Sequence, residues 1–187
     1  MDDPLVQDFF DATDELFRSQ TPEPEVPVRM LQTLRRLEDE DVHDLLPAMT
    51  IGMPKVVELM DAGNLTGCLS SLAYISFEAT RNVFTVHTEA RELASTMLDA
   101  AEAKVEVDQL PPGRAAHLIW VLGELGFQGR DVLEFSGALI RHLDAEKLCQ
   151  LELEALAKLS WGLAQLDIRD VPLSQELARA INQALIE

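Results

Sequence analysis

The sequence predicts an all-α protein: an α-solenoid of about three to four stacked helical-hairpin repeats, preceded by an N-terminal helix on a Pro-rich connector. Two observations carry this prediction. Leucine and alanine recur at spacings of three and four, the period of a helix, and few segments alternate as strands do. The chain also matches itself at an offset of 41 residues. With 187 residues, 47% of them apolar and 26% charged, the chain is long and apolar enough for a sizeable core.

The first element is predicted to be an acidic amphipathic helix over residues 1–19. Its apolar stripe consists of Phe9, Phe10, Leu16 and Phe17, with aspartates and a glutamate between them. Such a stripe either caps the main domain, which is the preferred interpretation, or docks into a partner protein.

A Pro-rich connector is predicted next, over residues 20–27. Pro22, Pro24 and Pro27 oppose a helix and favour an extended, polyproline-like segment. The connector should therefore separate the first helix from an α-helical repeat domain over residues 28–187.

The repeat is clearest in the last 78 residues of the chain, where residues 118–127 align with 159–168. The two repeats span 110–147 and 148–187. Each is predicted to be a pair of helices, the first over 112–126 or 151–166 and the second over 130–143 or 172–186. A looser copy aligns 72–77 with 122–127. One such hairpin cannot bury both of its faces, so neighbouring hairpins must stack.

The first helices of the two repeats supply the predicted core. Its members share an apolar stripe: Leu118, Trp120, Leu122, Leu125, Leu159, Trp161, Leu163 and Leu166. We expect both tryptophans to pack in this core; the alternative is that they stack on bases of a bound nucleic acid. The small residues Gly123 and Ala164 should let these helices approach closely.

The pattern Leu159-x-Trp161-x-Leu163-Ala164-x-Leu166 resembles the octotricopeptide and heptatricopeptide repeats. These helical hairpins occur in organellar RNA-metabolism proteins and in FAST-kinase-like mitochondrial proteins. The resemblance implies a mitochondrial or chloroplast location, and either RNA binding through the inner face or a structural place in an organellar complex. The chain departs from the RNA-binding members in lacking a basic face.

The charge is unevenly distributed along the chain. The formal net charge is −18, and residues 1–45 contribute half of it, with 13 acidic and 4 basic side chains. Such a balance disfavours a general role on nucleic acid or on anionic membranes, because both require clustered Lys and Arg. The candidate stripe for RNA or another ligand consists of Arg114, Arg130, Lys158 and Arg169.

Catalytic and metal-binding motifs are not expected. The sequence has no Gly-rich phosphate loop, no Gly-x-Ser-x-Gly and no His-Glu-x-x-His. Cys68 and Cys149 are not spaced as a metal pair and are expected to be small buried side chains. We therefore predict no enzyme activity and no cofactor.

The predicted function is that of a non-catalytic helical-repeat scaffold. It would bind proteins with basic surfaces in a large, organellar assembly, through the solenoid and the acidic N-terminal arm. The alternative is an RNA-binding repeat protein in mitochondrial or chloroplast RNA processing, translation or ribosome structure. No transmembrane segment is expected. A mature form or fragment in an organelle is the predicted location, and the cytoplasm is the alternative.

Overall fold

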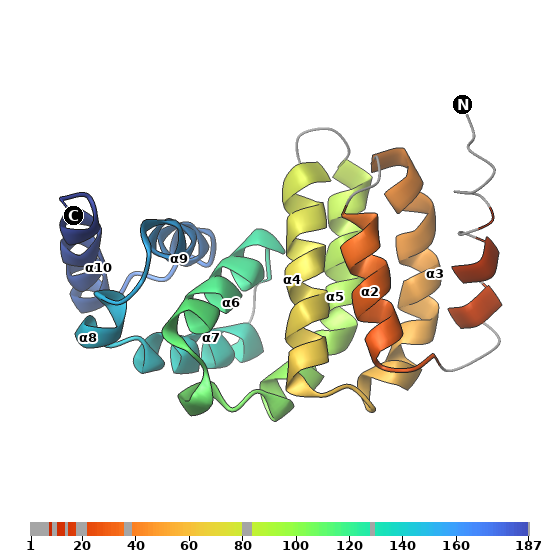
Figure 1. Ribbon diagram of the computed structural model, residues 1–187, viewed down its shortest axis with the longest axis horizontal. Helices are drawn as coiled ribbons and strands as arrows, with labels where there is room; N and C mark the ends of the chain where they lie inside the picture. Colours follow the sequence, from red (N-terminus) through yellow and green to blue (C-terminus); the bar gives the residue numbers. More distant parts are fainter. Residues whose placement is uncertain are drawn as a thin grey trace. The chain divides into compact units, whose positions relative to one another are not determined.

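In the computed structural model, every regular element of the described residues is a helix (Figure 1). The structure describes residues 8, 11–13, 15–17, 22–35, 39–79, 84–127 and 130–186. The elements in chain order are α2 (Glu25–Leu34), α3 (Asp39–Val57), α4 (Ala62–Ala79), α5 (Phe84–Lys104), the 3-10 helix η1 (Val107–Gln109), α6 (Pro112–Glu124), α7 (Arg130–His142), α8 (Ala145–Leu148), α9 (Leu153–Gln165) and α10 (Val171–Ala184). The predicted all-α class is confirmed, while the solenoid arrangement stays a prediction.

The chain divides into two compact units, residues 1–105 and 106–187. This division falls at a different place from the predicted one, which separated residues 1–19 from a single domain over 28–187. The difference arises because helical residues before the connector pack on α3, as Phe17 shows below. Each unit is therefore described by itself.

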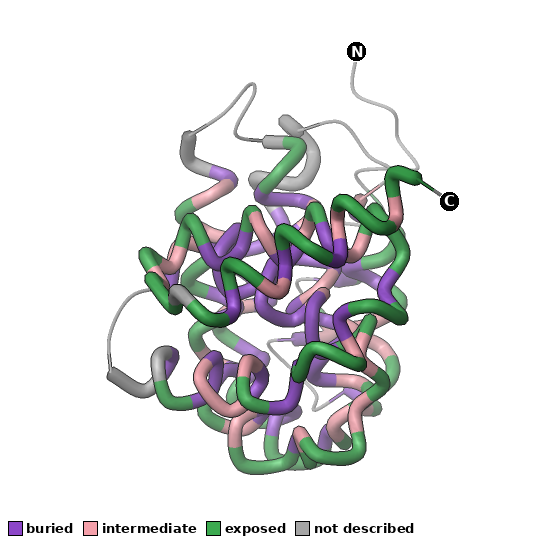
Figure 2. Tube along the Cα trace, turned by 90° about the vertical axis from the view of Figure 1, so that its left-hand side faces the viewer, coloured by how far each residue is buried: buried purple, intermediate pink, exposed green. Residues whose placement is uncertain are grey.

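In the first unit the four described helices pack in the order α2, α4, α5 and α3. Along the helices buried and exposed residues alternate, as Figure 2 shows, so each helix buries one side. The fully buried large side chains of this unit are Phe17, Leu31, Leu34, Leu45, Leu46, Met49, Met53, Met60, Leu65, Leu69, Leu72 and Leu93.

Phe17 belongs to this core, although it is one of the residues predicted as candidates for docking. Residues 11–13 and 15–17 are helical, and Phe17 is fully buried. Its ring lies against Gly52 of α3, where an added Cβ would be 2.6 Å from Phe17 Cδ1. Docking of Phe17 into a partner is thus wrong, and the alternative of an intramolecular cap holds for this residue. Leu16 is half-buried, and Phe9 and Phe10 lie outside the described residues.

The predicted extended connector over 20–27 is wrong at its last three residues. Helix α2 begins at Glu25, so Pro27 is its third residue. A proline is tolerated there because the first-turn N–H groups have no acceptor within the helix. Pro27 is buried in the core of the unit.

The end of α3 is capped by a side chain from the end of α5. Lys104 Nζ donates hydrogen bonds to the carbonyl oxygens of Val57, Glu58 and Met60, at 3.3, 2.8 and 2.8 Å. A helix leaves its last carbonyls without partners, and a lysine also complements the negative end of the helix dipole. One ammonium group therefore satisfies three carbonyls with its three N–H donors.

In the second unit the helices lie within a few residues of the predicted ones. The predicted 112–126 and 151–166 correspond to α6 and α9, and the predicted 130–143 and 172–186 correspond to α7 and α10. Helix α6 packs on α7 and α9, and α10 packs on α8 and α9.

Helices α6 and α9 end in the same kind of turn. After α6, Gly126 has φ 64° and the amide of Phe127 donates to the carbonyl of Leu122. After α9, Asp167 has φ 51° and the amide of Ile168 donates to the carbonyl of Leu163. Both are Schellman motifs, in which a left-handed residue lets the chain reverse and satisfies the last carbonyls. The two left-handed residues are 41 positions apart.

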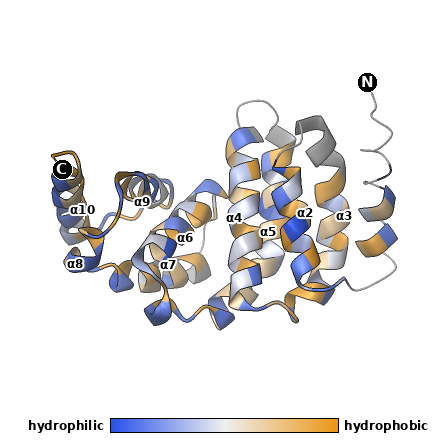
Figure 3. Cartoon of the chain, viewed as in Figure 1, coloured by the Kyte–Doolittle hydropathy of each residue, from blue (hydrophilic) through white to orange (hydrophobic). Residues whose placement is uncertain are grey.

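Hydrophilic and hydrophobic residues mix along the helices of both units (Figure 3). Among the described residues, none of the helices has the length and apolar character that crossing a membrane requires.

Candidate functional site

Helices α6 and α9 touch through their backbones. A Cβ added at Gly162 would lie 2.5 Å from the Ile119 carbonyl oxygen, and one added at Gly123 would lie 2.8 Å from Gly162 Cα. The glycines therefore permit the close approach. The predicted pair was Gly123 and Ala164; Gly162 takes the second place, and Ala164 is exposed.

Most of the predicted core residues of these two helices are buried, and one is not. The buried ones are Leu118, Trp120, Leu122, Leu125, Leu159 and Leu163. Leu166 is half-buried. Trp161 is 48% exposed, so its prediction as a core residue is wrong. The apolar stripe assigns a side to each residue of a helix, but burial also requires a neighbouring element on that side.

Trp120 has such a neighbour. Its side chain is 5% exposed, and the His117 ring stacks on it with the ring centroids 5.2 Å apart. Helix α9 lies over it: Lys158 Nζ is 5.6 Å from the ring centroid, and an added Cβ at Gly162 would lie 2.8 Å from Trp120 Cα. A cation at this distance from an indole face is attracted to it. Lys158 also pairs with Glu154 at 2.6 Å.

Trp161 is held by a hydrogen bond while much of its side chain remains exposed. Its Nε1–H donates to Glu124 Oε2 at 3.1 Å. Glu124 is only 8% exposed, and this burial raises the pKa of its carboxyl group, while the hydrogen bond from Trp161 lowers it by less. The indole is thus anchored at one edge on a buried carboxylate.

The sequence offered one signal for Glu124. The residue 41 positions later in the aligned repeat is Gln165, so a polar side chain occurs at this place in both copies. The stripe of leucines drew the prediction away from it.

The exposed face of α9 matches the face that α6 buries. On α6 the residues Ala116, Trp120 and Gly123 are buried. The residues 41 positions later on α9 are Ala157, Trp161 and Ala164, and all three are exposed. Leu153, one turn before Ala157, is also exposed and extends the stripe. We call Leu153, Ala157, Trp161 and Ala164 the α9 face.

The candidate stripe for RNA is largely neutralised by neighbouring acids. Lys158 pairs with Glu154, and Arg169 Nε pairs with Asp167 at 2.9 Å. Arg114 is exposed, and the side chain of Arg130 lies outside the described part of the structure. Two further cations of this unit also form ion pairs: Lys147 with Asp144 and Arg179 with Glu176.

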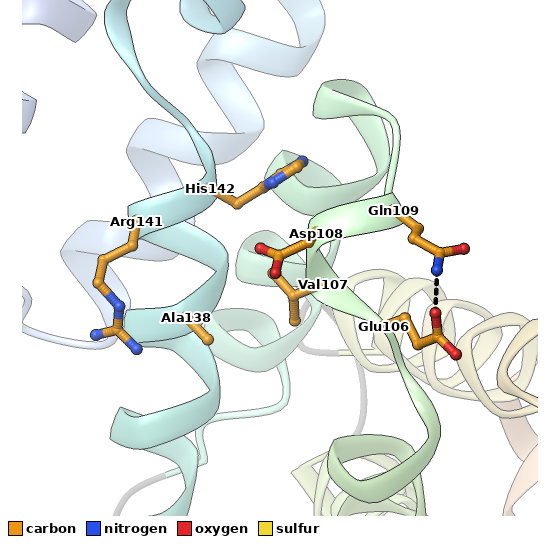
Figure 4. Close-up of a pocket in the computed structure, with 7 residues that line it drawn as sticks. All are labelled: Glu106, Val107, Asp108, Gln109, Ala138, Arg141 and His142. Atoms are coloured by element: carbon orange, nitrogen blue, oxygen red, sulfur yellow. Dashed lines mark hydrogen bonds between the residues drawn. The ribbon is translucent and has the colours of Figure 1, made fainter.

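A cleft of about 570 Å³ lies between η1 and α7, but its polar groups do not converge (Figure 4). The Glu106 carboxylate accepts a hydrogen bond from Gln109, and Arg141 points away from both. His142 Nε2 donates to the Leu110 carbonyl oxygen at 2.8 Å. The buried histidine of this cleft therefore connects the end of α7 to the residue after η1.

A serine and a histidine of the first unit also meet, without forming a reactive site. The Ser76 hydroxyl on α4 is hydrogen-bonded to His87 Nδ1 on α5. Ser76 is fully buried, so no substrate reaches its hydroxyl. Burial lowers the pKa of His87, and the nearby Arg91 lowers it further. The pair joins two packed helices.

The two cysteines and the metal ligands complete the survey of reactive groups. Cys68 is buried, whereas Cys149 is exposed, so the expectation of burial is wrong for Cys149. Among the described residues, no three His, Cys, Asp or Glu side chains are arranged to hold a metal ion.

Comparisons with protein-family models, with curated proteins and with solved structures find no match to this chain.

Proposed function

We propose that the chain is a non-catalytic helical scaffold that binds another protein through the α9 face. The observation that carries this proposal is the exposure of Trp161, a large aromatic side chain held in place by the buried carboxylate of Glu124. Rigid, partly exposed tryptophans are common energetic centres of protein interfaces, because they bury a large apolar area at little cost in conformational entropy.

The match between the two faces supports the same function. The residues of α6 that correspond to the α9 face are buried under another helix, so the surface has the composition of a helix-packing interface. The aligned helices and the two Schellman turns 41 residues apart also support a repeat. A repeat array offers extended surfaces of this kind to partners.

RNA binding is the weaker candidate. An exposed indole can stack on a base, but the neighbouring charges are acidic or already paired, as with Glu124, Glu154 and Lys158. The organellar location stays a prediction from the resemblance of the repeat.

Affinity purification of the tagged chain from its native organism tests the function. Wild type is compared with Trp161→Ala and with Ile51→Ala, a control that removes an exposed apolar side chain from the first unit. We expect proteins that wild type and Ile51→Ala retain to be lost with Trp161→Ala. The same proteins, purified, should bind Trp161→Ala at least about tenfold more weakly in direct titrations.

Two results would contradict the proposal. One is that Trp161→Ala keeps every partner that Ile51→Ala keeps. The other is that ribonuclease releases the Trp161-dependent partners and the chain binds single-stranded RNA with a steep loss of affinity as salt rises, which would favour the RNA alternative.

A further inference from the structure

We infer that the α9 face receives a helix of another protein, which carries a small residue at the crossing point and a lysine or arginine one turn before it. This inference rests on the proposed function and specifies the partner of the same face.

The contact between α6 and α9 supplies the first argument. Helix α9 presents two residues to Trp120: Gly162, whose backbone touches α6, and Lys158, whose ammonium lies over the indole ring. These residues are four positions apart, so they lie on one side of α9. A small residue with a cation one turn before it is therefore the pattern that covers this tryptophan.

The α9 face repeats the surface that this pattern covers. Ala157, Trp161 and Ala164 stand where α6 has Ala116, Trp120 and Gly123. Small residues one turn before Trp161 and about one turn after it leave room for a second helix axis to come close. Since Ala164 adds a methyl group relative to Gly123, the incoming helix needs its own small residue there.

The charge next to Trp161 supplies the second argument. Glu124 is 8% exposed, and the donor to its carboxylate is the neutral indole N–H of Trp161. In the part of the chain that the structure describes, the ion pairs do not include Glu124. Buried carboxylates are normally paired with cations. A cation over the exposed indole would lie next to this carboxylate.

The test uses the chain's own α9 as a model of the incoming helix. The probe is a synthetic peptide of residues 151–167, held helical by a covalent staple that replaces positions 157 and 161. Both positions are exposed in α9, so the staple leaves the α6-binding side of the peptide intact. The peptide's helicity is verified by circular dichroism before use.

The readout is the indole N–H resonances of the ¹⁵N-labelled full chain. We expect the Trp161 resonance to shift saturably with peptide, while the resonance of the buried Trp120 stays in place. A peptide with Lys158→Met should bind about three- to fivefold more weakly, and one with Gly162→Leu at least about tenfold more weakly. The Glu124→Gln protein keeps a hydrogen-bond acceptor for Trp161 but should prefer the lysine peptide much less.

Several outcomes would overturn the inference. They are an unmoved Trp161 resonance at about 1 mM helical peptide, equal binding of the Gly162→Leu peptide, or a saturable shift of Trp161 by oligouridine instead. A shift that depends on protein concentration without peptide would identify a second copy of the chain as the occupant. If the peptide fails while Trp161→Ala still loses its protein partners, the proposed function stands and only the helix pattern is wrong.

Discussion

Gly162 lies against Ile119 so closely that a methyl group on Gly162 would be 2.5 Å from the Ile119 carbonyl oxygen. The atom in the way is backbone, and it cannot rotate aside as a side chain would. We therefore expect Gly162→Ala to lower the free energy of unfolding of the second unit by about 3 kcal/mol. Both tryptophans belong to this unit, so their fluorescence during urea denaturation measures the change.

Gly113→Ala is the matched control, because an added Cβ at Gly113 meets nothing within 4 Å. Its stability should be unchanged or raised by up to about 1 kcal/mol, since alanine favours the helix. Equal effects of the two substitutions would contradict the close contact between α6 and α9.

The two tryptophans should respond very differently to truncation. Trp120→Ala should cost about 3–5 kcal/mol, because it empties a buried site under α9. Trp161→Ala should cost about 1–2 kcal/mol, because it removes one hydrogen bond and a half-exposed ring. Denaturation followed by the remaining tryptophan measures each value, and a cost for Trp161→Ala that matches Trp120→Ala would return Trp161 to the core.

Asp167 occupies a left-handed backbone conformation at the end of α9, with φ 51°. Glycine adopts this conformation without steric penalty, so Asp167→Gly should raise the stability of the second unit by about 0.5–1 kcal/mol. Asp167→Ala removes the same exposed ion pair with Arg169 but keeps a Cβ, and it should lower stability. If alanine and glycine act alike in chemical denaturation, the turn does not control the effect.

Glu124 should make the stability of the second unit depend on pH. Burial raises its pKa above the ordinary 4.5, so between 4.5 and the raised pKa the folded state binds more protons than the unfolded chain. Its contribution to stability therefore falls as pH rises through that window. Glu124→Gln should be more stable than wild type at pH 7, and this advantage should shrink as the pH is lowered towards 4.5. A difference that stays constant over that range would count against the burial of the charged form.

The two cysteines should differ in reactivity towards a thiol reagent. Burial raises the pKa of Cys68 to about 12, so at pH 8 only about one molecule in 10,000 carries the thiolate there, whereas Cys149 is exposed. Mass spectrometry should find one label on the native chain and two after denaturation. Cys149→Ser should remove the native label, and a persisting label would mean that Cys68 is reached in the folded state.

Much of the helical content follows from the sequence alone. Leucine periodicity, together with Pro112 and Gly126 at the ends of α6, predicts that helix to within two residues. The match at an offset of 41 residues likewise predicts α9 and its closing turn. These features are local, so a single segment of chain carries the information.

The candidate site could be predicted only in part, because burial depends on which elements cover a helix. Trp120 and Trp161 have the same local pattern, yet α9 covers the first while the second is half exposed. Phe17 shows the converse: its stripe is compatible with docking or capping, and Gly52, 35 residues away, decides between them. The role of Glu124 depends on the long-range hydrogen bond from Trp161.

The cap that Lys104 places on α3 has a consequence for biosynthesis. The carbonyls it satisfies belong to residues 57, 58 and 60, so α3 waits 44 or more residues for its final partner. During translation the amino-terminal unit cannot complete its fold until the end of α5 has left the ribosome. The natural pause point for this chain therefore lies after residue 105, where a nascent chain first holds every contact of that unit.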